Sequence, residues 1–115
     1  MSPKSQRQAG AIAEKVLTRL PDHPGAHHYI IHAYDYPPLA PKALKTARSY
    51  GDIAPAIPHA LHMPTHIFTR LGLWQESITM NKRSAAAALK HPAGSKISLH
   101  YPHALDYLVY AYLQQ

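Results

Sequence analysis

The chain has no cysteine, no long apolar run and few acidic residues. Its 115 residues contain 6 Asp and Glu against 12 Lys and Arg, which gives a formal charge of +6 with neutral histidines. Without cysteine there can be no disulfide, no thiolate metal ligand and no thiol nucleophile. No 18 consecutive residues are apolar, so we expect no membrane-spanning helix. An apolar secretory core is missing near the N-terminus as well, and we expect a cytoplasmic protein.

Several catalytic and binding motifs are also missing. The metalloprotease motif needs a glutamate directly after its first histidine, but Tyr29 follows His28 and Met63 follows His62. There is no G-x-S-x-G nucleophile turn and no glycine-rich phosphate loop. The basic residues are scattered and accompany no known nucleic-acid-binding motif. Nucleic acid is therefore not an expected partner.

What the sequence does have is ten histidines, some of them in a repeated pattern. Residues 24–32 and residues 58–66 both fit Pro-x-Ala-x-His-x-x-x-His, and the two copies are 34 positions apart. A degenerate third copy at 102–110 keeps the proline and the alanine but has Asp106 and Tyr110 at the two histidine positions. Residues four apart share one face of a helix, so each full copy should direct two imidazoles the same way.

Proline and glycine divide the chain into segments with apolar residues at helical spacing. No segment has the alternating pattern of a strand, and the sequence predicts an all-α domain over residues 1–115. The predicted helices cover approximately residues 5–20, 25–35, 39–52, 58–71, 75–90 and 102–114.

A 34-residue period is also that of the tetratricopeptide (TPR) repeat. The turn Leu71-Gly72-Leu73-Trp74 before Gln75-Glu76-Ser77-Ile78, and the helix-closing Pro21, Pro55 and Pro92, resemble TPR sequences. Residues 23–35, 58–74 and 103–110 resemble a family of histidine-rich bacterial TPR proteins of unassigned function. This resemblance implies an α–α superhelix of about six antiparallel helices: two full hairpins with one flanking helix at each end. It also implies a concave groove lined by the first helix of each repeat.

The candidate ligand-binding residues lie on these first helices: His28, His32, His59, His62, His66, His103, Asp106 and Tyr110. Four of them, His28, His32, His62 and His66, are candidate metal ligands, because neighbouring helices pack about 8–10 Å apart and the two pairs could reach one shared point. Asp106, with His59 or His103, could add a further ligand. Nitrogen and oxygen donors without sulfur suit zinc, copper(II), nickel or ferrous iron.

Other interpretations of the histidines remain open. They could hydrogen-bond tyrosines or carbonyls in helix seams, or line a groove for a protein, peptide or small ligand without a metal. The remaining histidines (His23, His27, His91 and His100) lie near turns, where exposed polar residues are normal. Two functions follow: a TPR-like binding or scaffold module with a histidine-lined groove, with or without a metal, or a metal-dependent or His/Asp-based hydrolase or lyase. Asp106 is the first candidate base and Asp35 the second.

Pro64, between His62 and His66, allows two local structures. It could kink a continuous helix and re-aim His62. It could instead be the first residue of a new helix, in which case we expect His62 and His66 to lie on different faces.

The last helix is apolar around most of its circumference and should be covered. The chain is then either a piece of a longer array, or it self-associates, with the terminal helix of one copy on an open face of another.

Overall fold

Helices form all the elements in residues 2–92 and 96–115, the part of the chain that the computed structural model describes. The all-α prediction is confirmed for these residues. The segment between the helices predicted at 75–90 and 102–114 lies partly outside them. The elements in chain order are α1 (Pro3–Arg19), α2 (Pro24–Ala33), the short 3-10 helix η1 (Ala40–Ala43), α3 (Leu44–Ile53), α4 (Pro58–His62), α5 (Pro64–Arg70), α6 (Trp74–Lys90) and α7 (His100–Gln114).

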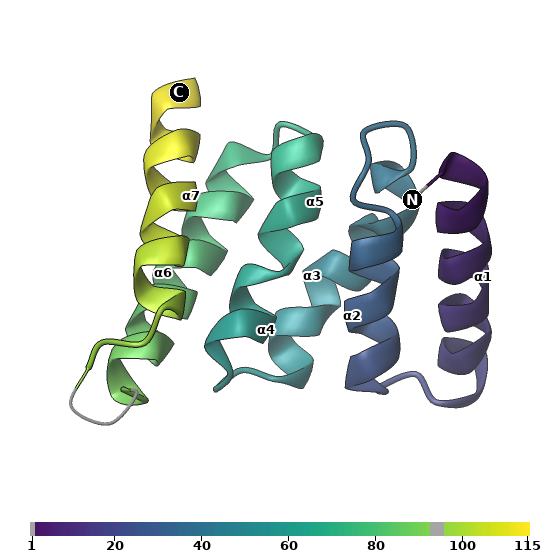
Figure 1. Ribbon diagram of the computed structural model, residues 1–115, viewed down its shortest axis with the longest axis horizontal. Coiled ribbons are helices and arrows are strands. Elements are labelled where there is room, and N and C mark those ends of the chain that lie inside the picture. Colours follow the sequence, from purple (N-terminus) through teal and green to yellow (C-terminus); the bar gives the residue numbers. More distant parts are fainter. Residues whose placement is uncertain (1, 93–95) are drawn as a thin grey trace.

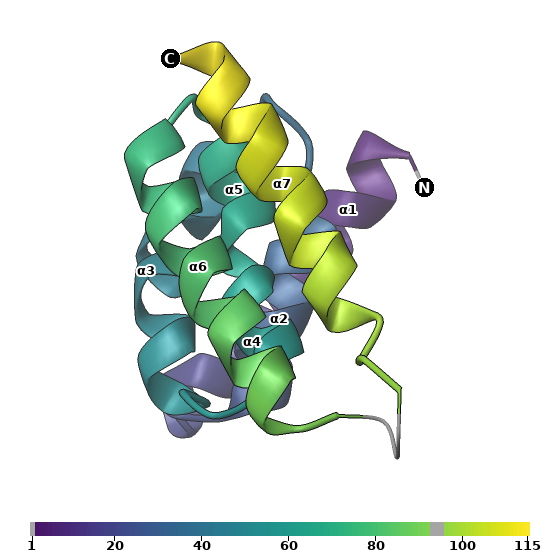
Figure 2. The same cartoon turned by 90° about the vertical axis from the view of Figure 1, so that its left-hand side faces the viewer.

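The helices form a two-layered array that runs from α1 at one end to α7 at the other (Figure 1). Successive helices alternate in direction, with α4 and α5 together counting as one arm. In the two views, α2, α4–α5 and α7 lie in one layer, and α3 and α6 lie in the other (Figures 1 and 2). All the histidines of the repeated pattern therefore come from the same layer.

Proline and glycine set the ends of these helices. Proline at a first helical position loses no hydrogen bond there, and this is where Pro3, Pro24, Pro58 and Pro64 stand. Helix α5 ends at Arg70 and is followed by Gly72, whose φ of 71° lies in the left-handed region that glycine adopts without strain. The Leu73 N–H donates to the Phe68 carbonyl at 2.8 Å, and the Gly72 N–H donates to the Thr69 carbonyl at 3.3 Å. These two bonds form a Schellman motif, which turns the chain sharply into α6.

The core lies between the two layers and is built from large side chains with almost no exposure, such as Tyr34, Ile31, Leu39, Ile67 and Phe68. Helix α1 packs onto this core across Gly10. A Cβ at Gly10 would lie only 2.1 Å from the Tyr34 ring, so a larger residue there would force the two apart. The Tyr34 hydroxyl donates to Glu14 at 3.1 Å and fixes the contact.

The segment around Pro64 combines features of both local structures that the sequence suggested. A new helix does begin at Pro64, but Met63 keeps right-handed helical angles (φ −53°, ψ −41°), so the backbone stays helical from α4 into α5. The Thr65 hydroxyl donates to the His62 carbonyl at 2.7 Å. The His66 N–H donates to the Met63 carbonyl, three residues earlier, rather than to the His62 carbonyl. As a result, His62 and His66 still face each other, and the expectation that a helix start would separate them is wrong.

The third predicted helix, 39–52, begins with the 3-10 segment η1 and becomes α-helical at Leu44. None of the helices in the described part of the chain combines the length and the apolar character needed to cross a bilayer.

The last helix leaves apolar side chains exposed, among them Val109 at 59% and Leu113 at 77%. Self-association through this surface stays a prediction.

Candidate metal centre

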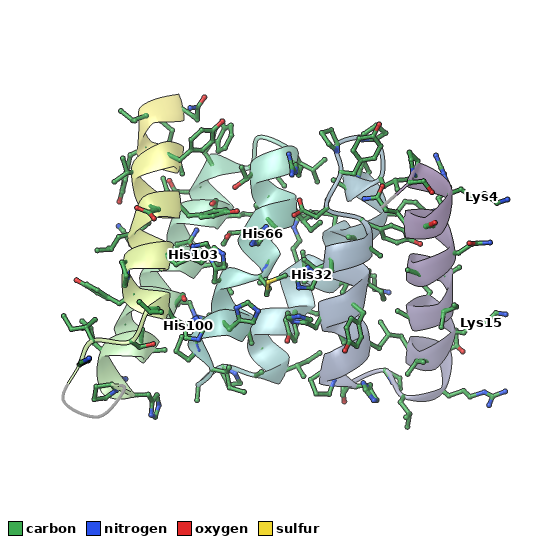
Figure 3. The ribbon with its side chains drawn as sticks, in the orientation of Figure 1. Lys4, Lys15, His32, His66, His100 and His103 are labelled. Atoms are coloured by element: carbon green, nitrogen blue, oxygen red, sulfur yellow. The ribbon has the colours of Figure 1, made fainter. Side chains whose placement is uncertain are left out.

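Six histidines lie in two groups of three on the layer formed by α2, α4–α5 and α7. We call His62, His66 and His103 the C-terminal triad, and His28, His32 and His59 the N-terminal triad. Within each triad, one ring nitrogen per residue lies within 4.8 Å of the others, so each triad could hold one metal ion. Figure 3 shows His32, His66, His100 and His103 in the region between α2 and α7, whereas Lys4 and Lys15 lie on α1 at the far end.

The C-terminal triad brings two imidazole nitrogens into direct contact. The Nε2 atoms of His62 and His66 are 3.1 Å apart, and the His103 ring centre lies 4.3 Å from that of His62. Two nitrogen ligands of a tetrahedral zinc ion, each at 2.0–2.1 Å from the metal, would lie about 3.3 Å apart. The separation of the two nitrogens is therefore close to that of two ligands of one ion.

The protonation of the His62 ring is set by its neighbours. Its Nδ1 lies 2.8 Å from the Asn81 amide oxygen; that amide is oriented by its nitrogen, which donates to the Ser77 carbonyl. The Thr65 hydroxyl, 3.4 Å from the same Nδ1, already directs its hydrogen to a carbonyl and can only accept. Nδ1 therefore faces two acceptors and carries the hydrogen, which leaves a lone pair on Nε2.

The His66 ring is oriented in the same way from its other side. Its Nδ1 lies 3.1 Å from a carboxylate oxygen of Asp35 and 3.3 Å from the Tyr107 hydroxyl. The other Asp35 oxygen accepts from Arg70 Nε at 2.8 Å. Burial alone would raise the pKa of Asp35, but the hydrogen bonds from His66 and Arg70 hold it below its usual value. Asp35 is thus an ionised acceptor for the His66 Nδ1–H, and His66 also presents its Nε2 lone pair.

Two Nε2 lone pairs 3.1 Å apart repel each other unless a positive centre lies between them. A bridging proton or a metal ion would provide it. Burial, together with the His66 and His103 rings, lowers the pKa of His62 to about 4, despite the opposing hydrogen bond to Asn81. His62 is therefore neutral at pH 7, which is the form that binds metals. Ligand histidines in proteins typically donate their second N–H to a carboxylate or carbonyl, as His66 and His62 do here.

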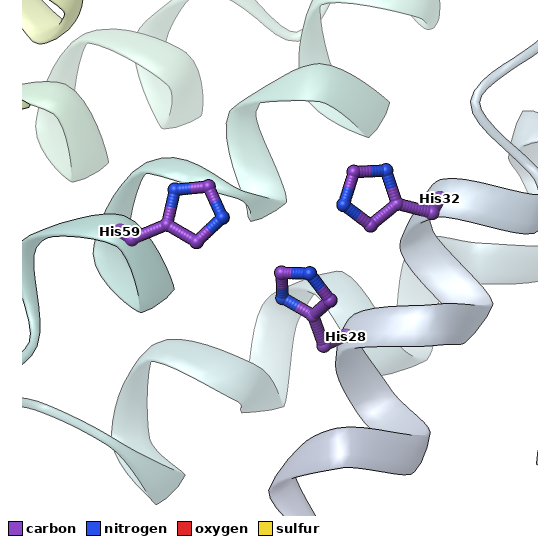
Figure 4. A group of neighbouring side chains, drawn as sticks. All are labelled: His28, His32 and His59. Atoms are coloured by element: carbon purple, nitrogen blue, oxygen red, sulfur yellow. The ribbon is translucent and has the colours of Figure 1, made fainter.

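The N-terminal triad is more open and has fewer polar partners. The His28 ring centre lies 4.6 Å from that of His32 and 5.3 Å from that of His59, and the three rings surround a common space (Figure 4). Burial, followed by the neighbouring His28 and His100 rings, lowers the pKa of His59 to about 4. The His28 Nδ1 is 3.4 Å from the Tyr50 hydroxyl. Among the described residues, no hydrogen bond holds the rings of His32 or His59.

The structure thus divides the four predicted metal ligands between two sites rather than one. His28 and His32 are joined by His59, and His62 and His66 are joined by His103. Asp106 belongs to neither triad. Together with Tyr110 it lines a pocket beside His66, and Tyr110 also packs edge-on against Trp74.

Sequence reasoning overlooked several residues of this region. His27 was expected near the surface but is 5% exposed, with its Nε2 bonded to the Pro21 carbonyl. His100, set aside as a loop residue, lies next to His59 with ring centres 5.6 Å apart. Asn81 was missed, although a signal exists: the buried residues of α6 include polar ones at helical spacing, namely Ser77, Asn81 and Ser84.

Comparison with known proteins adds nothing to this geometry: no family model, curated protein or solved structure matches the chain.

Proposed function

We propose that this protein is a TPR-like helical module that binds a divalent transition metal ion, such as zinc, at the C-terminal triad. The observation that carries the proposal is the pair of Nε2 lone pairs held 3.1 Å apart, with both Nδ1–H groups bonded elsewhere. A proton on His66 Nε2 would make this contact a hydrogen bond to His62. With both rings neutral, two acceptors lie opposite each other beside a third imidazole, an arrangement that suits a metal ion.

The proposed ion would have three protein ligands and an open fourth position. In a structural zinc site the protein supplies all four ligands, whereas a site with three binds water or an external group as the fourth. His103 is exposed, so this position can be reached from solvent. We therefore propose that the histidine-lined layer is the binding surface of the module, with a protein, a peptide or a small ligand as its partner.

The N-terminal triad is proposed as a second, weaker metal site. Its three imidazoles also place one ring nitrogen each within 4.8 Å of the others, but neither a carboxylate nor an amide among the described residues orients them. The rings must then become ordered when the metal binds, which costs free energy and lowers the metal affinity of this triad.

The test is metal binding by untagged protein, since a polyhistidine tag would bind metal itself. We expect one zinc ion to bind tightly and a second more weakly in competition titrations with a chromophoric chelator. His103→Asn should remove the tight site, with a loss greater than the roughly 10–100-fold typical of second-shell changes. The matched control is His91→Asn, an exposed histidine outside both triads. Circular dichroism checks that the variants stay folded.

Cobalt(II) gives an independent readout, because its visible spectrum reports the number and type of ligands. A tetrahedral nitrogen-rich spectrum that His103→Asn abolishes and His91→Asn keeps would support the site. If wild type and His103→Asn bind zinc and cobalt equally, the C-terminal triad is not a metal site.

A second function, a metal-dependent hydrolase, is favoured by the same open fourth position. Catalytic zinc sites commonly have three protein ligands and a water whose pKa the metal lowers to about 7. The readout is zinc-dependent hydrolysis of an activated ester, lost in His103→Asn. An equal rate with zinc-loaded wild type and zinc-loaded His103→Asn would reject the enzyme and leave the binding module untouched.

A further inference from the structure

A pocket of about 370 Å³ lies beside the C-terminal triad, on the Asp35 side of His66. Its walls come from α5, from α7 and from the segment after α2, and they include Asp35, Thr69, Arg70, Asp106, Tyr107 and Tyr110. Pockets that bind small molecules have volumes of about 300–1,000 Å³, with a few polar groups among apolar and aromatic walls. This pocket is at the small end of that range.

Arg70 presents a fixed positive charge to this pocket. Its Nε donates to Asp35, which holds the guanidinium in place, while its terminal nitrogens have no hydrogen-bond partner among the described residues. A guanidinium held at one edge and free at the other is suited to a bidentate contact with a carboxylate.

Asp106 presents the opposite charge. It forms no ion pair or hydrogen bond with any of the described residues, and it is exposed on α7 one turn after His103. Because Asp35 already pairs with Arg70, Asp106 adds an unpaired negative charge to the pocket. A simple anion would be repelled by Asp106, and a simple cation would leave the free edge of Arg70 unused.

Aromatic and hydroxyl groups complete the walls. Tyr107 and Tyr110 are one helical turn apart on α7. The Tyr107 ring packs against His66 and the Tyr110 ring against Trp74, and the accessible surface that the two rings leave in the pocket can pack against an apolar or aromatic side chain.

We propose that this pocket binds a free amino acid with an apolar or aromatic side chain. Arg70 would hold its carboxylate, Asp106 its ammonium group, and the two tyrosines its side chain. This proposal goes beyond metal binding. His66 of the C-terminal triad also lines the pocket, but the charged groups that would bind the amino acid, Arg70 and Asp106, belong to neither triad.

The experiment titrates the metal-free protein with L-phenylalanine by calorimetry or NMR. N-acetyl-phenylalanine lacks the positive charge, and phenylalanine amide lacks the negative one. We expect phenylalanine to bind more tightly than both derivatives. Arg70→Gln should weaken phenylalanine binding by about 10- to 100-fold, the range for a lost hydrogen bond to a charged group, and should not weaken binding of the amide, a cation that Arg70 repels. Asp106→Asn should weaken phenylalanine binding and should not weaken binding of the N-acetyl form, an anion that Asp106 repels.

Matched controls keep the result interpretable. Arg19→Gln and Asp22→Asn remove the same charges at the α1 end of the array and should bind phenylalanine as wild type does. His103→Asn should also keep phenylalanine binding, so failure of the metal site and failure of the pocket are seen separately. The proposal is overturned if phenylalanine does not bind at millimolar concentration, if it binds no better than its two derivatives, or if Arg70→Gln and Asp106→Asn bind it as wild type does.

Discussion

The N-terminal triad and the C-terminal triad come from the same repeated pattern but differ in what surrounds their rings. In the C-terminal triad, Asn81 and Asp35 hold the outer nitrogens of His62 and His66 at 2.8 and 3.1 Å. In the N-terminal triad the only such contact from the described residues is the longer one from Tyr50 to His28, at 3.4 Å. The imidazoles recur with the repeat, whereas the groups that orient them do not.

A single position on the second layer explains much of this difference. Asn81 lies on α6 behind His62; the residue 34 positions earlier is Ala47, on α3, which is buried and has no polar side chain. Metal affinity depends on second-shell partners as well as on ligands. Two sites with equal numbers of histidines can therefore differ in affinity, and the comparison predicts which one is stronger.

The largest expected difference between the triads is in stability. His62→Ala should lower the free energy of unfolding of the metal-free protein by about 3–5 kcal/mol, since it leaves a cavity and an unpaired buried Asn81. His62 is 2% exposed, whereas His28 is only partly buried. His28→Ala should therefore cost about 1 kcal/mol. Urea unfolding followed by circular dichroism measures both, and equal losses would contradict the proposed asymmetry.

The stability of the folded chain should depend on pH because His59 and His62 have lowered pKa values. The pKa of His59 and of His62 is about 4 in the folded chain, against an ordinary value of 6.5 for histidine. Between these values the unfolded chain binds more protons, so stability is full above about pH 7 and falls as pH drops toward 4. His62 alone contributes about 3 kcal/mol to this loss.

Unfolding in urea between about pH 7.5 and 4.5 measures this slope for the metal-free protein. Burial also lowers the pKa of His28, which therefore adds to this slope. His59→Asn removes one of these three groups and should flatten the slope, while His91→Asn should not. A free energy of unfolding that stays constant over this range would show that the two imidazoles are not held neutral by burial.

The sequence predicts the helices well because proline and glycine, which are visible in the sequence, set where several of them begin and end. Pro24 and Pro58 begin α2 and α4 because proline has a fixed φ and no N–H, and Gly72 follows the end of α5 because glycine can adopt a positive φ. Spacing by four also predicts that His28 and His32 face the same way, and likewise His62 and His66, as their ring contacts show.

The third member of each triad was harder to predict because it depends on how helices cross. His59 and His103 reach the triads from other helices, and spacing within one helix carries no information about such contacts. The sequence also offered Asp106 as an added ligand, from its place in the degenerate third copy. The structure instead places Asp106 one turn beyond His103, in the neighbouring pocket. Met63 shows a similar limit: its helical angles before Pro64, which keep the backbone helical from α4 into α5, are disfavoured locally and reflect packing.

Removing the Asp35 carboxylate, which accepts from His66, should lower zinc affinity at the C-terminal triad and leave that of the N-terminal triad unchanged. In Asp35→Asn a single amide oxygen replaces two carboxylate oxygens, so either the His66 Nδ1–H or Arg70 Nε loses its acceptor. We expect zinc affinity at the C-terminal triad to fall by about 10–100-fold. A chelator competition in a His32→Asn background isolates this site. In a His103→Asn background, which leaves only the N-terminal triad, Asp35→Asn should change nothing; a loss there too would indicate a general effect on folding.

The smallest effect is expected for Tyr50→Phe, which removes the one polar contact that the described residues make to the N-terminal triad. Burial raises the pKa of Tyr50, so its hydroxyl stays protonated and can either donate to His28 Nδ1 or accept from it. Unlike the acceptor-only Asp35 carboxylate, it does not select one form of the ring, and a contact of 3.4 Å is weak. Zinc affinity at this triad, measured in the His103→Asn background, should change by less than about threefold. A loss as large as that in Asp35→Asn would mean that Tyr50 orients His28 as firmly as Asp35 orients His66, and the proposed ranking of the two sites would fail.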